Sequence, residues 1–111
     1  MAQVILLRYN ILLNCYFFYD SKGENYMRVC IAVFRSRTQV MAFIEYMQKM
    51  GVNCTTVPTP KEAKIGCGIS AKVPISMMNK ASEVISANRL TAFYGFFVIT
   101  KNGNRTTTVR F

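Results

Sequence analysis

Cys67 stands between Gly66 and Gly68, and this short pattern is the strongest candidate for chemistry in the chain. The two glycines free the backbone and remove side chains that would shield the sulfur, so we expect an accessible thiol. Three lysines lie near it in the sequence: Lys61, Lys64 and Lys72. Nearby positive charge favours the thiolate, which is the nucleophilic form of cysteine. The pattern therefore predicts a reactive thiol with lysines in an electrostatic role.

Two prolines precede this cysteine and shape the loop that leads to it. Pro58 and Pro60 each fix φ and remove a backbone donor, and each restricts the residue before it to extended geometry. We therefore expect a rigid segment at 57–60, followed by a loop that Gly66 and Gly68 allow to turn. The alternative is that Cys67 is an ordinary turn or core cysteine, since free cysteine is among the most buried residue types.

The remaining chemistry-bearing residues exclude several classes of site. The chain has four cysteines, no two of them in CxxC spacing, and no histidine. A mixed Cys/His zinc site and the usual histidine-dependent nucleophile arrangements are therefore excluded. Five scattered carboxylates show no acid/base pair. We expect no metal, no cofactor and no enzyme activity. Cys30 and Cys54 fall in predicted strands and are expected in the core, with Cys54 the one candidate resolving partner for Cys67.

Composition predicts one globular domain with a basic surface. The chain has 111 residues, 51% of them hydrophobic, and a formal net charge of +9, which suggests an anionic partner. Residues 1–26 hold two basic and two acidic residues, so the whole excess lies in 27–111. We expect 1–26 to be an N-terminal extension, with Met27 as an alternative start, and 27–111 to be the domain. The other interpretation is an N-terminal element that packs on the domain. We find no secretory signal and no membrane span, and expect a cytoplasmic protein.

Hydrophobic periodicity predicts the elements that must position the thiol. Strands are expected at 28–34, 52–57, 69–73 and 94–100, with an edge strand at 105–111. One helix should begin after Ser36, whose spacing to Gln39 fits a capping box, and end at Gly51. A second should run from Pro74 to Asn88. From residue 27 this order is α+β and typical of a ferredoxin-like βαββαβ sandwich with an extra C-terminal edge strand.

The segment Pro-Thr-Pro-Lys-Glu at 58–62, followed by Cys67 and Gly68 within that order of elements, resembles the selenium/sulfur carrier-like protein family. The resemblance covers residues 28–99. It implies that Cys67 carries sulfur or selenium as a persulfide or selenosulfide, and that its partners are a donor and an acceptor protein. Members of the family often have small polar residues before the Cys-Gly pair, where this chain has Lys64, Ile65 and Gly66.

Two other functions remain open at this stage. A non-catalytic interaction or regulatory domain could pair through its sheet or through the 105–111 edge strand, for example as a homodimer. Nucleic-acid binding is suggested by the charge, but an RNA-recognition sheet needs aromatic residues on its central strands. The strand at 69–73 has none, and the adjacent Phe96 and Phe97 must point to opposite faces. We therefore do not expect a nucleic-acid partner.

Overall fold

The computed structural model describes residues 16–19, 25–65 and 67–111. Six strands are present in these residues: β1 (Tyr16–Tyr19), β2 (Asn25–Phe34), β3 (Thr55–Pro58), β4 (Ile69–Val73), β5 (Phe93–Asn102) and β6 (Arg105–Arg110). The helices are α2 (Arg37–Lys49) and α3 (Met78–Ala87), with two 3-10 turns, η1 (Lys61–Ala63) and η2 (Ile75–Met77). The expected α+β class is confirmed.

All described strand pairs are antiparallel, in the order β3-β4-β2-β5-β6, and β1 pairs with the first part of β2. The middle strand β2 therefore has β4 on one edge and β5 on the other. Numbered from β2 onwards, the four strands of the predicted pattern stand in the order 2-3-1-4, which is compatible with the ferredoxin-like arrangement.

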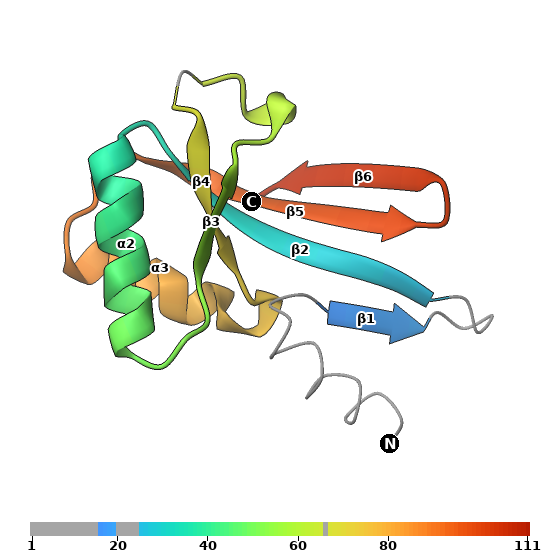
Figure 1. Cartoon of the computed structure of the whole chain (residues 1–111), viewed down its shortest axis with the longest axis horizontal. Coiled ribbons are helices and arrows are strands. Elements are labelled where there is room, and N and C mark those ends of the chain that lie inside the picture. The colour runs from blue at the N-terminus through green and yellow to red at the C-terminus, as the bar shows by residue number, and fades with distance from the viewer. Residues whose placement is uncertain (1–15, 20–24, 66) are drawn as a thin grey trace.

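Both helices lie on the same face of the sheet (Figure 1). The larger buried cluster joins them to that face and includes Phe34, Phe43, Met47 and Val73. A smaller cluster lies on the opposite face, where Ile31, Val33 and Phe97 pack with Ala63 of η1. The expectation that neighbouring phenylalanines point to opposite faces is confirmed, because Phe96 belongs to the helix-side cluster and Phe97 to the other.

The helix α2 begins with only half of the predicted capping box. The hydroxyl of Ser36 accepts a hydrogen bond from the backbone N–H of Gln39 at 3.3 Å, as expected of an N-cap serine. The side chain of Gln39 does not return to Ser36; its Oε1 accepts from the backbone N–H of Ala92 at 2.8 Å. Because Ala92 O also accepts from the N–H of Arg35 at 2.7 Å, the turn before α2 is tied to the turn before β5.

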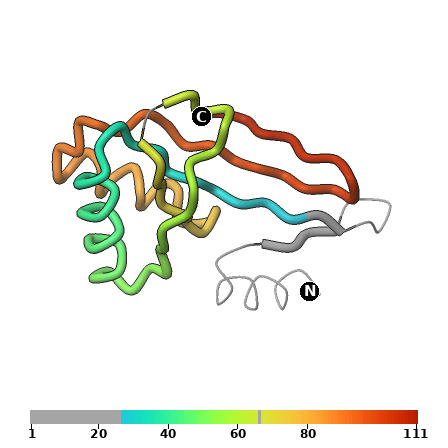
Figure 2. The backbone as a smooth tube through the Cα atoms, turned by 45° about the horizontal axis from the view of Figure 1, so that its top comes forward, coloured from blue at the N-terminus to red at the C-terminus, as the bar shows by residue number. Residues whose placement is uncertain are grey.

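The hairpin of β5 and β6 extends past the helical layer (Figure 1 and Figure 2). Its two-residue turn places Gly103 at φ 63°, a left-handed conformation that suits glycine. At the other end of the hairpin, a Cβ on Gly95 would lie 2.8 Å from Nε of Arg110, so only glycine leaves room for this side chain.

The domain boundary at Met27 stays a prediction. Within residues 1–26 the structure describes β1 and residues 25 and 26, where β2 begins. β1 pairs with β2, from Tyr16 opposite Arg28 to Tyr19 opposite Asn25. The remainder of the range, residues 1–15 and 20–24, lies outside the described residues. Among the described helices, none combines the length and the apolar character needed to cross a bilayer.

Candidate functional site

Cys67 lies in the loop that connects β3 to β4, two residues before β4 begins. The last pair of this ladder joins Pro58 to Ile69, and the backbone N–H of Thr59 donates to the carbonyl of Gly68 at 3.2 Å. Pro60 then continues in extended geometry, with φ −60° and ψ 143°. Both prolines therefore lie where the chain leaves β3, and the rigidity expected of residues 57–60 stays a prediction.

A hydrogen bond between two side chains also closes this loop. The hydroxyl groups of Thr59 and Ser70 lie 2.7 Å apart, and Ser70 is fully buried. The chain between them forms the turn η1 and then reverses at Lys64, which has the left-handed φ of 53°. Gly66 lies outside the described residues, so its predicted role in shaping the loop stays a prediction. Gly68 is exposed, with no atom near the position that a Cβ would take.

The side chain of Cys67 is half-buried and packs against the helix-side cluster. Its thiol donates a hydrogen bond to the carbonyl of Ile69 at 3.4 Å. This bond exists only for the protonated sulfur, so a reacting thiolate has to give it up. The sulfur is thus held in one position but is not enclosed.

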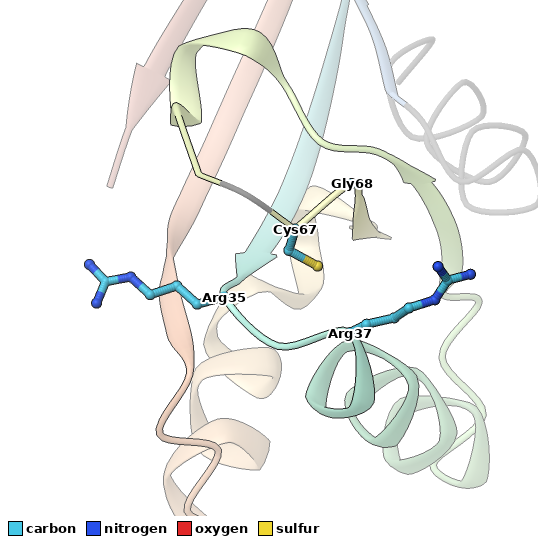
Figure 3. A pocket seen from close by; sticks show the side chains of 4 residues that line it. All are labelled: Arg35, Arg37, Cys67 and Gly68. Atoms are coloured by element: carbon cyan, nitrogen blue, oxygen red, sulfur yellow. The ribbon is translucent and has the colours of Figure 1, made fainter.

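Cys67 lines a cavity of about 390 Å³ together with Arg35, Arg37 and Gly68. Figure 3 shows Arg35, in the turn before α2, and Arg37, the first residue of α2, extending in opposite directions, with Cys67 above and between them. The guanidinium of Arg35 lies over the ring of Tyr94, 5.1 Å from its centre. The N-terminus of α2, where a helix dipole carries partial positive charge, adjoins the same cavity through Arg37. Two basic residues therefore line the cavity, and their guanidinium groups point away from the sulfur to either side.

The topology explains why the two arginines and Cys67 line the same cavity. Strands β2 and β4 are antiparallel and pair Ala32 with Ala71. The chain that leaves β2 after Phe34 and the chain that enters β4 at Ile69 must therefore lie at the same end of the sheet. Arg35 and Cys67 are the residues just outside those two strand ends, one position and two positions away.

The three predicted lysines lie elsewhere. Lys72 is directly opposite Ile31 in the ladder, and Ile31 packs on the face that carries no helix, so Lys72 is on the opposite face of the sheet from Cys67. Lys61 and Lys64 are exposed on and after η1, whose Ala63 packs on that same face. None of the three lines the described cavity at Cys67.

Sequence reasoning missed Arg35 and Arg37. Both are far from Cys67 along the chain, and Arg37 falls in the predicted start of a helix. The signal that could have found them is the topology itself, because a βαββαβ order brings the turn after its first strand to the same end of the sheet as the loop between its second and third strands.

Cys30 and Cys54 are fully buried in the helix-side cluster, as predicted. Burial raises the pKa of the Cys30 thiol from an ordinary 9.0 to about 12, and the neighbouring Cys54 adds to the rise while Arg28 opposes it. Burial alone raises the pKa of Cys54 to about 12. Both thiols therefore stay protonated and inert at neutral pH.

The geometry does not support Cys54 as a resolving partner for Cys67. Thr55, the next residue after Cys54, pairs with Lys72. Lys72 lies three residues beyond Ile69, where β4 begins, so at about 3.3 Å per residue this stretch of strand alone separates Cys54 from the Cys67 end of the hairpin by about 10 Å. A disulfide needs Cα atoms within about 7 Å, so this pair cannot close without rebuilding the hairpin.

Within the part of the chain that the structure describes, no three metal-ligating side chains gather at one place.

Comparison with known proteins identifies the family. A model of the family described as "Putative Se/S carrier protein-like" matches residues 29–94, which is more than half of the chain and includes β3, the loop, Cys67 and both helices. Comparison with curated proteins and with solved structures gave no match. The chain belongs to the Se/S carrier protein-like family.

Proposed function

We propose that this protein carries sulfur or selenium on Cys67, as a persulfide or selenosulfide. The observation that carries the proposal is the contrast among the described thiols. Cys67 is partly exposed in an arginine-lined cavity, whereas Cys30 and Cys54 are buried with their pKa values raised to about 12. Thiol exchange needs an accessible thiolate, so these differences favour a single reactive position.

The proposed loading step requires no outside oxidant. The Cys67 thiolate attacks the outer sulfur of a donor persulfide, R–S–S–H. A new S–S bond forms at Cys67 while the donor's own S–S bond breaks, and the donor leaves as the thiolate R–S⁻. The product is Cys67–S–S–H, and the outer sulfur keeps its proton. A donor selenosulfide, R–S–Se–H, would load selenium by the same exchange.

Arg35 and Arg37 support this chemistry through their charge. A persulfide ionises to an anion, and the two arginines that line the cavity carry permanent positive charge on either side of it, with their guanidinium groups pointing away from Cys67. Positive charge of this kind also attracts an acidic donor or acceptor protein and speeds its encounter. We therefore propose that the donor docks at the end of the sheet where β2 leaves and β4 begins.

The fold and the cell compartment complete the proposal. We propose that β2 to β5 with α2 and α3 form a ferredoxin-like sandwich, with β6 as an added edge strand; the strand order supports this. Cys30, Cys54 and Cys67 are free thiols, which is typical of a reducing, cytoplasmic setting. A carrier of this type is consumed and reloaded by its partners, so we propose no catalytic turnover of its own.

Intact-protein mass tests the proposal directly. A Cys15→Ser variant, made because Cys15 lies outside the described residues, is incubated with a low-molecular-weight persulfide and with sulfide alone as a control. We expect incubation with the persulfide, and not with sulfide, to add the mass of one sulfur atom. The added sulfur should lie on the peptide that contains Cys67. Adding Cys67→Ser should abolish the gain.

Two results would overturn the assignment. One is a folded protein that gains no sulfur while its Cys67 still reacts with an ordinary alkylating agent, because the thiol would then be accessible but not a carrier. The other is a gain that survives Cys67→Ser, since the sulfur would then sit on Cys30 or Cys54.

A further inference from the structure

The two ends of the sheet path differ in how they are protected from further pairing. β3 is four residues long and ends at Pro58, features that limit strand addition at that edge. β6 is six residues long and contains no proline, no lysine and no register shift in its pairing with β5. Among the described strands, β6 pairs with β5 alone. Apart from the charged Arg105 and Arg110 at its two ends, its outer edge therefore lacks the usual safeguards of an edge strand.

One hydrogen bond between β5 and the residue after β6 fixes which backbone groups point outwards from this edge. The N–H of Phe111 donates to the carbonyl of Phe96 at 2.7 Å, so these two residues form a hydrogen-bonded pair. Hydrogen-bonded pairs alternate along an antiparallel ladder. Val109, Thr107 and Arg105 therefore also bond to β5. The N–H and C=O groups of Thr106, Thr108 and Arg110 face the free edge.

The side chain of Arg110 does not guard that edge. Its guanidinium lies over the ring of Tyr94, 4.0 Å from the centre, and Nη2 donates to the carbonyl of Tyr94 at 2.6 Å. Gly95 leaves the room for this arrangement. The guanidinium of Arg110 therefore lies on the face of the sheet. The outward-facing backbone groups of β6 remain accessible to a partner strand.

We propose that β6 pairs antiparallel with β6 of a second copy of this chain, with the twofold axis at Thr108. The outward groups of Thr106, Thr108 and Arg110 make this register self-complementary: Thr108 faces Thr108 of the second copy, and Thr106 faces Arg110. Three such pairs exchange about six main-chain hydrogen bonds. A continuous sheet then runs through both copies from β3 to β3.

The side chains of the strand favour a second copy in this register. Like charges directly opposite each other are destabilising in a ladder, but here Arg105 lies opposite Phe111 of the second copy and not opposite an arginine. Phe111 and Val109 are 64% and 49% exposed in the single chain, and the pairing would place each beside a strand of the other copy. The exposed apolar groups at this end of β6 thus gain neighbours.

This inference is separate from the carrier chemistry. β6 and most of β5 lie beyond residue 94, where the family match ends, and Cys67 takes no part in the pairing. The net charge of +9 on each copy opposes association, and salt screens that repulsion. Self-association should therefore strengthen as salt is raised, whereas binding of an acidic partner to the same edge would weaken.

Sedimentation of the full chain at increasing concentration tests the proposal. Because an edge pairing buries less area than a standard interface, the series should extend to about 0.5 mM. We expect a monomer–dimer equilibrium that shifts towards dimer between low and high salt. Thr108→Pro removes an outward N–H and no bond to β5, and should weaken the dimer about tenfold or more. Thr108→Val keeps that N–H and should dimerise like the parent.

Cysteine cross-linking tests the register of the pairing. It remains informative if the Thr108→Pro variant fails to fold. In a background of Cys15→Ser and Cys67→Ser, Thr108→Cys should form a disulfide-linked dimer on mild oxidation. Thr107→Cys, whose counterpart is Val109 and not itself, should cross-link several-fold more slowly. A monomer at every concentration and salt, or equal cross-linking at both positions, would overturn the proposal. So would association that weakens with salt.

Discussion

The hydroxyl groups of Thr59 and Ser70 lie 2.7 Å apart and join the two strands from which the Cys67 loop projects. Ser70 is fully buried, so its hydroxyl depends on this partner. The adjacent bond from Thr59 N–H to Gly68 O lies on the same short segment. These contacts fix the base of the loop independently of the residues at its tip.

Ser70→Ala should therefore loosen the loop. We expect the free energy of unfolding to fall by about 1 kcal/mol, because one buried hydrogen bond is lost. Hydrogen exchange of the Thr59 amide should accelerate more than this global loss explains. Ser82→Ala, at an exposed position of α3, is the matched control and should change neither quantity. An unchanged Thr59 amide would show that the hydroxyl pair does not hold the loop.

The described thiols should differ sharply in reactivity. In a Cys15→Ser background at pH 7.5, we expect one fast thiol per folded chain, assigned to Cys67 by peptide mapping after alkylation. Cys30 and Cys54 are buried with pKa values raised to about 12, so they should react only as the chain unfolds. The sign of failure would be alkylation of either buried thiol at a rate independent of denaturant below the unfolding transition.

Alkaline pH should destabilise the fold through the two buried thiols. The folded chain keeps both protons up to a pKa of about 12, whereas the unfolded thiols ionise near their ordinary 9.0. The unfolded state therefore binds fewer protons, and stability falls as pH rises from 9 towards 12. Each thiol contributes a slope of at most about 1.4 kcal/mol per pH unit.

Denaturant titrations between pH 8 and 10.5 can isolate this effect. Cys30→Ala should reduce the slope of stability against pH in that interval. Val40→Ala, equally buried in the same cluster but without a titrating group, should lower stability and leave the slope unchanged. Parallel slopes for Cys30→Ala and the parent would mean that Cys30 ionises in the folded chain.

The arginines, and not the lysines, should govern access of anions to Cys67. Replacing Arg35 and Arg37 by glutamine should slow the reaction with an anionic disulfide reagent about fivefold at low salt, because focused positive charge raises the local concentration of anions. Reaction with a neutral thiosulfonate should hardly change. Lys61→Gln with Lys64→Gln removes the same charge from the other face and is the control. An equal effect from both double variants would favour the sequence-based interpretation.

Local sequence patterns were sufficient to predict most of the elements of this domain. The strand at 69–73 matches β4, and Ser36 caps α2 as its type and spacing indicate. The second helix differs in its first turn, which is the 3-10 turn η2 before α3. β3 begins at Thr55, later than predicted, because Val52 and Cys54 pack beneath the helices before the ladder with β4 starts.

The site was harder to predict, because its charge comes from a distant part of the chain. Proximity in sequence suggested Lys72, which alternation along β4 sends to the opposite face. Arg35 comes to the same end of the sheet as Cys67 only through the antiparallel pairing of β2 with β4. Which of two basic residues lies near a thiol is a question of strand register and face, and a linear motif does not contain that information.

Gly95 and Arg110 should show strong energetic coupling. A Cβ at Gly95 would meet Nε of Arg110 at 2.8 Å, so Gly95→Ala must displace that side chain from Tyr94. We expect a loss of about 1–2 kcal/mol, from one hydrogen bond and one cation–π contact. In an Arg110→Ala background the same substitution should cost far less. Additive losses in this double-mutant cycle would show that the two positions do not share one contact.

The short connection between Cys67 and the sheet sets how far its sulfur can travel. Ile69, the first residue of β4, is two residues away, and the thiol itself bonds to that residue's carbonyl. A thiol on a long flexible tail can swing into the catalytic pocket of another protein, but this one cannot leave its scaffold. Any molecule that reacts with Cys67 must therefore bring its own reactive group to this loop, and one with a deeply recessed sulfur would be unable to exchange with it.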